Sequence, residues 1–142
     1  MARGNPASMH TLAHLDELTE LVGLGVPVYL RYSPGPEADA AHPSVDHESG
    51  LPMPGHSANP LRPPEWWTRP AADWLARRVC QYLRGHREDI RPWVLTGDVI
   101  DFGPDNEPLL VNVRPIAWLS AELVDEARHR YQHNLEAGRA HR

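Results

Sequence analysis

The feature that most constrains the fold is a proline-rich stretch between residues 33 and 70, which holds nine of the 15 prolines of the chain. Proline fixes φ and lacks a backbone donor, so this stretch cannot form a long helix or a central strand. Its large apolar residues are typical of a segment that packs on a core, because disordered segments are poor in such groups. They are Leu51, Met53, Leu61, Trp66 and Trp67. The sequence therefore predicts a long proline-rich loop inside the domain, of the kind that carries function.

Length and composition fit one compact domain. The 142 residues are 41% hydrophobic and 23% charged, and a chain of this size buries roughly two-thirds of its surface without disulfides or a structural metal. The single cysteine, Cys80, cannot form an internal disulfide, and we expect it to be a small buried hydrophobe on a helix. We predict one globular domain over residues 11–138, with flexible tails at residues 1–10 and 139–142.

Charge and hydropathy exclude several kinds of partner. The net charge is −5 and all 14 basic residues are arginine, so the chain lacks the cationic surplus that non-specific nucleic-acid binding needs. The longest apolar run, at residues 21–30, is interrupted by Pro27 and is shorter than the roughly 20 residues of a membrane span. The N-terminal residues lack the pattern of a signal peptide. We expect a cytoplasmic protein that binds neither nucleic acid nor membranes.

Hydrophobic periodicity predicts six regular elements. Apolar residues at helical spacing predict three helices, at residues 12–22, 73–84 and 121–137. Runs of β-branched and aromatic residues predict three strands, at residues 26–32, 93–102 and 109–120. The turn GPDNEP joins the last two strands into a hairpin, and Ser120 is expected to cap the last helix. This order of elements predicts an α+β fold with a small, largely antiparallel sheet, three helices and the proline-rich loop.

The predicted middle helix has five residues that share one face. Trp74, Arg78 and Tyr82 recur at a spacing of four residues and therefore share a side of the helix. The same side carries Leu75 and Val79.

Arg31, in the motif YLRYS, is the first residue that suggests chemistry. It lies near the end of a predicted buried strand, where a guanidinium needs a partner because arginine does not lose its proton. One interpretation is a structural ion pair with an acid of the proline-rich stretch, such as Asp39, Asp46 or Glu48. The other is a bidentate clamp for the pyrophosphate or carboxylate of a ligand. The residues themselves leave both open.

Ser57, in the motif GHSANP, is the second candidate. The Asn-Pro pair that follows it favours an extended edge or a turn at this point. One interpretation gives the Ser57 hydroxyl a hydrogen bond to a ribose or to a neighbouring acid. The other is an ordinary serine that stabilises a turn.

Asp105 and Glu107, in the motif GPDNEPLLV, are the third. They are two residues apart, so their side chains share a face if the segment is extended. Paired carboxylates raise each other's pKa and are able to divide acid and electrostatic roles around a sugar carbon. The alternative is a polar hairpin turn with a solvated Glu107, and spacing alone favours this alternative.

The order of these motifs resembles the arginine-serine-glutamate class of ADP-ribosyltransferases. YLRYS is similar to the aromatic-Arg strand of that family, GHSANP occupies the place of its serine strand, and DNEPLLV resembles its acid-x-Glu motif before a hydrophobic strand. The resemblance covers residues 28–119 as an order of elements. It departs from the family at GHSANP, which lacks the Ser-Thr-Ser pattern, and at Asp105, where the family has Glu or Gln. The whole chain also resembles an uncharacterised actinobacterial family of small proteins with the motifs RYS, WW and GPDNEP.

The resemblance implies an NAD-using enzyme that cleaves the nicotinamide–ribose bond and passes ADP-ribose to an unknown acceptor or to water. It implies that Arg31 grips the pyrophosphate, that Ser57 supports the nicotinamide ribose and the catalytic acid, and that Glu107 bonds the ribose 2′-hydroxyl. Asp105 would activate or orient the acceptor. Three aromatic residues are candidates for stacking on the rings of NAD: Tyr32, Trp66 and Trp67.

Two other functions stay open. One is a non-catalytic module in which the proline-rich loop and the pair Trp66 and Trp67 dock a protein or a small ligand. A zinc-binding hydrolase is the third hypothesis, because Asp125, His129 and His133 recur at helical spacing. With nine histidines in the chain, chance pairs are common, so a solvated helix face is the simpler interpretation of those three residues. We therefore expect no metal.

Overall fold

The computed structural model describes residues 9–83 and 89–136 and has an α+β fold, as the sequence predicts. Its strands are β1 (Thr11–Leu12), β2 (Tyr29–Ser33), β3 (His56–Ser57), β4 (Asn59–Pro60), β5 (Arg91–Phe102) and β6 (Pro108–Leu119). Its helices are α1 (Leu15–Gly23), α2 (Pro36–Ala41), α3 (Ala71–Gln81) and α4 (Ala121–Tyr131), and α4 continues as a π-helix at Gln132–Glu136.

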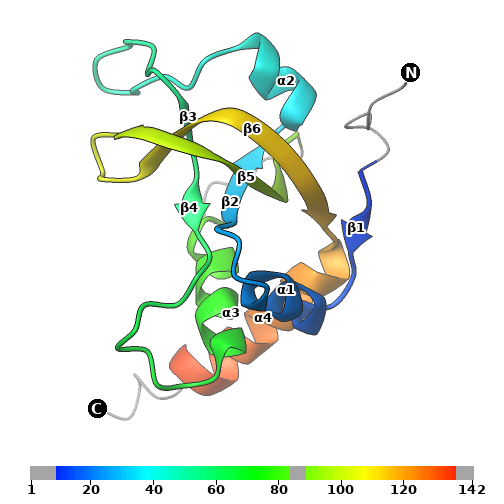
Figure 1. Cartoon of the computed structure of the whole chain (residues 1–142). Coiled ribbons are helices and arrows are strands. Elements are labelled where there is room, and N and C mark those ends of the chain that lie inside the picture. Colours follow the sequence, from blue (N-terminus) through cyan, green and yellow to red (C-terminus); the bar gives the residue numbers. More distant parts are fainter. Residues whose placement is uncertain (1–8, 84–88, 137–142) are drawn as a thin grey trace.

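The β5–β6 hairpin is the longest part of the sheet (Figure 1). Its two strands have 12 residues each and are joined at the predicted turn. On its other side β5 pairs antiparallel with β2, with Leu30 opposite Val94. The short strand β1 pairs with the end of β6 in parallel orientation. The sheet is therefore mixed, although the pairings of its long strands are antiparallel as predicted.

A short extended segment closes the sheet into a ring. The strand order runs from β6 through β5 and β2 to β4, and β3, which precedes β4 by one residue, pairs back onto β6. A Cβ atom on Gly55 would lie 2.8 Å from the Leu110 carbonyl oxygen, so glycine is required for this close approach to β6. Residues 55–60 therefore contact both the hairpin and β2.

Helices α1, α3 and α4 gather on one side of the sheet (Figure 1). Their inward residues Leu18, Leu75 and Leu123 are fully buried and belong to one core cluster with Leu30 and Val94 of the sheet. Each buried leucine side chain contributes about 2 kcal/mol through its removal from water. This cluster is the main core of the protein.

The opposite face of the sheet carries a second, smaller cluster. Side chains alternate between the two faces of a strand, so the neighbours of Leu30 and Val94 point away from the main core. Five buried residues form this second cluster: Tyr29, Ala58, Trp93, Leu95 and Leu110. Arg31 is two residues from Tyr29 along β2 and therefore lies on this face.

The proline-rich stretch contains a helix that the sequence did not predict. Residues Pro36–Ala41 form α2, so the described residues hold four α-helices instead of the three predicted. Proline stands in the first turn of α2, where its missing N–H would have no partner in any case. The prolines therefore exclude long helices from this stretch but permit a short one.

The first helix starts later than predicted. It begins at Leu15, because Glu17 Oε1 accepts hydrogen bonds from the backbone N–H groups of Ala13 and His14 at 2.8 and 2.9 Å. This arrangement resembles a capping box, which marks the N-terminus of a helix. Leu12 was predicted to begin the helix. It belongs instead to β1, which pairs with β6.

Other boundaries differ by a few residues. Ser120 caps α4 as predicted, since its hydroxyl accepts the Leu123 N–H at 3.0 Å. The middle helix begins at Ala71 and ends at Gln81, while its predicted end at residue 84 lies outside the described residues. The strand predicted at 26–32 begins at Tyr29.

The predicted tails are described only at residues 9 and 10. Met9 packs against the second cluster, and the His10 carbonyl accepts the Trp118 N–H at 3.0 Å. Residues 1–8 and 139–142 lie outside the described residues. In the part of the chain that the structure describes, no helix has the length and apolar character of a membrane span.

Candidate functional site

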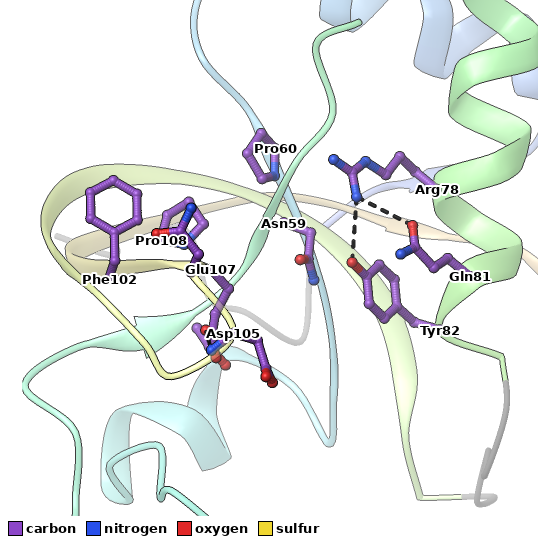
Figure 2. Close-up of a pocket in the computed structure, with 11 residues that line it drawn as sticks. Asn59, Pro60, Arg78, Gln81, Tyr82, Phe102, Asp105, Glu107 and Pro108 are labelled. Atoms are coloured by element: carbon purple, nitrogen blue, oxygen red, sulfur yellow. Dashed lines mark hydrogen bonds between the residues drawn. The ribbon is translucent and has the colours of Figure 1, made fainter. Parts of the chain in front are cut away.

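A cleft of about 690 Å³ lies between the hairpin turn, the β3–β4 segment and the end of α3 (Figure 2). The residues that line it are Ser57, Asn59 and Pro60, then Arg78, Gln81 and Tyr82, and finally Phe102 and residues 105–108 of the hairpin. In Figure 2 the groups from α3 face the hairpin groups, with Asn59 and Pro60 between them. Three residues singled out from the sequence, Ser57, Asp105 and Glu107, line this cleft.

Asp105 and Glu107 lie on a tight turn. The Gly103 N–H donates to the Glu107 carbonyl at 2.8 Å, and Asn106 has a left-handed φ of 63°. Glu107 Oε1 accepts the Asp105 backbone N–H at 3.0 Å, and a Cβ atom on Gly103 would lie 2.5 Å from the Glu107 carboxyl carbon. The tight turn fits the hairpin-turn interpretation, although the Glu107 side chain is half-buried and bonded within the turn and not fully solvated. The Glu107 carboxylate nonetheless lines the cleft, and among the described residues it accepts this single hydrogen bond.

The Arg31 guanidinium is bonded to the protein and does not line the cleft. Its Nε and Nη2 donate to the two carboxylate oxygens of Asp39 at 2.6 and 3.4 Å. Its Nη1 donates to the Ser57 carbonyl at 2.6 Å and lies 3.3 Å from the Ser57 hydroxyl. The exposed fractions of the Arg31 and Asp39 side chains are 14% and 12%. Of the two interpretations of Arg31, its contacts fit the structural ion pair. Arg31 also contacts Ser57, the second candidate residue.

Further buried groups support this ion pair. The Ser33 hydroxyl donates to Asp39 Oδ2 at 2.7 Å and accepts the Trp93 indole N–H at 2.8 Å. The Ser44 hydroxyl accepts the Ser57 backbone N–H at 3.3 Å. The network joins β2, α2, β3 and β5. Because a buried charge is tolerated only when it is paired and hydrogen-bonded, this network explains how a guanidinium is accommodated beside the second cluster.

Arg78 is a cation that lines the cleft, and sequence reasoning did not name it as a site residue. Its Nη1 donates to Gln81 Oε1 at 3.2 Å and lies 3.5 Å from the Tyr82 hydroxyl. Its Nε is buried and has no hydrogen-bond partner among the described residues. The guanidinium carbon lies 5.0 Å from the centre of the Trp74 ring. The available signal was the place of Arg78 on a helix face that it shares with apolar and aromatic residues.

Tyr82 adds a neutral hydroxyl to the cleft. Burial raises the pKa of Tyr82 above its usual value, and the negative charge of Glu107 acts in the same direction, against the opposing effect of Arg78. Tyr82 is therefore protonated at neutral pH. Tyr32, predicted to stack on a ligand, does not line the cleft, because its hydroxyl donates to the Val79 carbonyl at 2.6 Å and its ring lies 6.3 Å from that of Tyr82.

Trp66 and Trp67 belong to an aromatic cluster outside the cleft. The ring centres of Trp66, Trp67 and Trp74 lie 5.1 to 6.2 Å apart in edge-to-face arrangements. Arg77 lies over this cluster, 5.6 Å from the Trp67 ring centre. Trp67 is half-buried and donates its indole N–H to the Pro70 carbonyl at 3.1 Å, whereas Trp66 is 70% exposed. Trp67 thus anchors the proline-rich stretch, and Trp66 presents its ring to solvent.

The described histidines form no metal site with other ligands. Within residues 9–83 and 89–136 no group of three or more His, Cys, Asp or Glu side chains is placed to hold a metal ion. His129 and His133 are exposed, as on a solvated helix face. Burial lowers the pKa of the half-buried His56, and the positive charge of Arg31 lowers it further. Cys80 is half-buried and packs against the main core.

Comparison with protein families gives the family of this chain. The model described as "Family of unknown function (DUF6098)" matches residues 5–141. The chain belongs to the DUF6098 family. Comparison with curated proteins and with solved structures gives no match. The predicted membership of an uncharacterised family is confirmed, whereas the match gives no support to ADP-ribosyltransferase motifs or to an actinobacterial origin. The function of this DUF6098 protein therefore has to be argued from its own residues.

Proposed function

We propose that the cleft binds NAD and that the protein is an ADP-ribosyltransferase-like enzyme, which releases nicotinamide and passes ADP-ribose to water or to an unknown acceptor. One observation carries the proposal. Ser57 and the pair Asp105 and Glu107 come from segments far apart in the sequence and line one cleft. The cleft volume of about 690 Å³ lies within the range of roughly 300–1,000 Å³ that is usual for small-molecule sites.

The chemistry assigned to Glu107 needs a carboxylate with free lone pairs. An ionised carboxylate has about four acceptor positions, and Glu107 accepts one hydrogen bond, from Asp105. The remaining positions are available to the ribose 2′-hydroxyl. When the nicotinamide–ribose bond breaks, its electron pair leaves with nicotinamide and positive charge develops on the sugar. A nearby carboxylate stabilises this charge better than water does, because it is already oriented.

The other residues would complete the reaction. Asp105 is exposed and lines the cleft beside Glu107, where it would orient the water or acceptor that attacks the sugar carbon and take up the proton released. Ser57 would contact the ribose. Arg31, which bonds Ser57 and Asp39, is a positioning residue in this proposal and not the group that grips the pyrophosphate.

Replacement of Glu107 with glutamine tests the proposal. We expect wild-type protein to release nicotinamide from NAD, and Glu107→Gln to reduce the rate by about a hundredfold or more, as for the loss of a group that stabilises a transition state. Nicotinamide is measured by liquid chromatography, and circular dichroism checks that the variant is folded. Glu48→Gln, at an exposed acid outside the cleft, is the matched control and should retain the full rate. An equal rate in Glu107→Gln, or no release by wild-type protein, would contradict the proposal.

A second candidate function rests on the exposure of Trp66. A tryptophan that is 70% exposed and held against Trp67 and Trp74 is typical of an anchor residue for a protein partner. In this alternative the protein is a non-catalytic binding module. We would expect chemical cross-linking in cells to join the protein to one partner, and Trp66→Ala to abolish that product. Leu51→Ala, a second exposed apolar residue of the same stretch, should leave it intact. Loss of the product in both variants would argue against a specific role for Trp66.

A further inference from the structure

Arg78 differs from several other arginines, because no ion pair with a carboxylate is found for it among the described residues. Arg31 is paired with Asp39, Arg128 with Asp125, and Arg69 and Arg130 are both paired with Asp73. The acceptors of Arg78 are the neutral oxygens of Gln81 and Tyr82, and in the described part of the chain it has no ion pair within 4.0 Å. The charge is permanent, since arginine is not deprotonated in proteins. A partly buried, permanent positive charge without a counter-ion favours the binding of an anion.

The Arg78 side chain is held in place before any ligand arrives. Its guanidinium lies over Trp74, with 5.0 Å between the guanidinium carbon and the ring centre, and Nη1 is bonded to Gln81 on the same helix. Stacking on an aromatic ring and a hydrogen bond both reduce the conformational freedom that binding would otherwise remove. Among the described residues Nη2 makes no hydrogen bond, so its N–H groups are left for a new acceptor, whereas the buried Nε is out of reach of a ligand.

The cleft has a positive and a negative part that do not neutralise each other. Arg78 and the acids Asp105 and Glu107 line the same cleft, yet no ion pair joins them among the described residues. Figure 2 shows Arg78 on the α3 side and the two acids on the hairpin side. A ligand that suits both parts carries an anionic group at one end and sugar hydroxyls at the other. A nucleoside diphosphate has this build, because it joins an anionic diphosphate to a ribose. Its phosphate oxygens suit Arg78, since a guanidinium group is able to bind two of them at once.

From these observations we infer that Arg78 binds the diphosphate of the cleft's ligand, the role that the sequence resemblance implies for Arg31. The inference rests on the proposed function, since it takes the cleft to be a ligand site. Arg78 is then a residue that determines specificity for phosphorylated ligands, while Glu107 acts on the sugar.

Arg77 provides a matched control. It is the neighbour of Arg78 on α3, it is exposed, and its guanidinium carbon lies 5.7 Å from the same Trp74 ring. It does not line the cleft. Arg77→Gln and Arg78→Gln therefore remove the same charge from the same helix and differ in whether the lost group faces the cleft.

Calorimetric titration with three probes tests the inference: ADP-ribose, inorganic pyrophosphate, and nicotinamide riboside, which lacks the diphosphate. We expect Arg78→Gln to weaken ADP-ribose and pyrophosphate binding by about ten- to a hundredfold, as for the loss of a charged hydrogen-bonding group. Arg77→Gln should change both affinities by less than about twofold, and both variants should bind nicotinamide riboside like wild type. Circular dichroism checks folding, and Arg78→Lys, which keeps the charge but loses the fork, serves if Arg78→Gln does not fold.

The outcomes separate this inference from the proposed function. If Arg78→Gln binds ADP-ribose as tightly as wild type while Glu107→Gln still abolishes nicotinamide release, the role of Arg78 is wrong and the enzyme function stands. If pyrophosphate binding depends on Arg78 but wild-type protein releases no nicotinamide, the anion site stands and the enzyme function is wrong. Equal losses in Arg77→Gln and Arg78→Gln would show a general charge effect and overturn the inference. Failure of wild-type protein to bind any probe overturns both.

Discussion

Arg31 and Arg78 both lie close to the β3–β4 segment, yet their surroundings are opposite in kind. Arg31 is surrounded by acceptors: the carboxylate of Asp39, and the carbonyl and hydroxyl of Ser57. Arg78 has two neutral acceptors and an aromatic ring, and part of its guanidinium has no partner. A guanidinium that is already saturated by its own protein stabilises the fold, whereas one that is not remains available to a ligand. A sequence motif does not distinguish these cases, because it names the residue and not its partners.

The largest effect that tests this comparison is expected from Arg31→Ala. The change leaves the Asp39 carboxylate buried with the Ser33 hydroxyl as its side-chain donor, and the loss of one partner of a buried ion pair costs about 3–5 kcal/mol. Urea unfolding of wild type and variant measures the free energy of unfolding. The double variant Arg31→Met with Asp39→Leu should recover most of the loss, since it leaves no unpaired charge. A cost below about 1 kcal/mol, with loss of ADP-ribose binding, would return Arg31 to the role of a ligand-binding group.

Asp73 offers a second buried carboxylate with arginine partners. Arg130 Nε and Asn134 Nδ2 donate to its Oδ1 at 2.7 and 3.0 Å, and Arg69 lies at 3.4 Å from Oδ2. The arginines are half-exposed, so solvent screens their charges and we expect Asp73→Asn to cost less than Arg31→Ala, about 2–3 kcal/mol at neutral pH. Urea unfolding measures this cost.

The effect of Asp73 should depend on pH with a defined sign. Burial alone raises the pKa of Asp73, but the hydrogen bonds from Asn134 and Arg130 and the charges of Arg130 and Arg69 outweigh it, so the pKa is lower in the folded chain than in the unfolded chain. The stabilisation is therefore complete above the unfolded pKa of about 3.9 and is lost as the pH falls through the lower folded value. The difference in unfolding free energy between wild type and Asp73→Asn should shrink in that acid range. A difference that grows on acidification would contradict this assignment.

A smaller effect is expected from Ser33→Ala. The change removes the hydroxyl that accepts from Trp93 and donates to Asp39, and it leaves the buried indole N–H of Trp93 without an acceptor. Such a loss costs about 1–3 kcal/mol. Ser49→Ala, at an exposed serine bonded to Asp46, is the control and should have little effect on the thermal midpoint. Similar midpoints for the two variants would mean that the buried network around Arg31 contributes little.

The smallest effect on stability is expected from Arg78→Gln. The variant loses the contact with Trp74, which is worth about 1 kcal/mol or less for a partly exposed pair, and it also relieves a charge that has no counter-ion. We expect a change in unfolding free energy within about 1 kcal/mol of that for Arg77→Gln. A loss as large as that of Arg31→Ala would make Arg78 a structural residue and would remove the contrast between the two regions.

Much of the fold follows from local sequence patterns. The hairpin is predictable because GPDNEP separates two long runs of strand-forming residues, and the start of α4 because Ser120 has the right chemistry for a cap. The ring closure is not predictable from such patterns, since β3 and β4 have two residues each and show no periodicity. Their place depends on Gly55 and on two distant strands. The helix α2 was missed for the same reason: six residues are too few for a periodic signal.

The candidate site shows the same limit. The order of the motifs suggested that Arg31, Ser57 and Glu107 converge at one cleft, with Asp105 beside Glu107. Ser57, Asp105 and Glu107 line one cleft, whereas Arg31 does not. Sequence reasoning named Asp39 as one of three possible partners of Arg31 but could not choose among them, because that choice depends on the position of α2. Arg78 was placed on the correct helix face, yet its significance depends on its lack of an ion pair among the described residues, which is a property of the folded chain.

Ser57 belongs to both regions. Its carbonyl and hydroxyl oxygens accept hydrogen bonds from the Arg31 guanidinium, and the same residue forms part of the cleft wall. One wall of the cleft is therefore held by hydrogen bonds from Arg31, which does not itself line the cleft. A molecule that pushed Ser57 outward would have to lengthen those hydrogen bonds. Because Ser57 belongs both to the cleft wall and to the strand that closes the sheet, a tightly bound ligand should also slow the separation of β3 from β6.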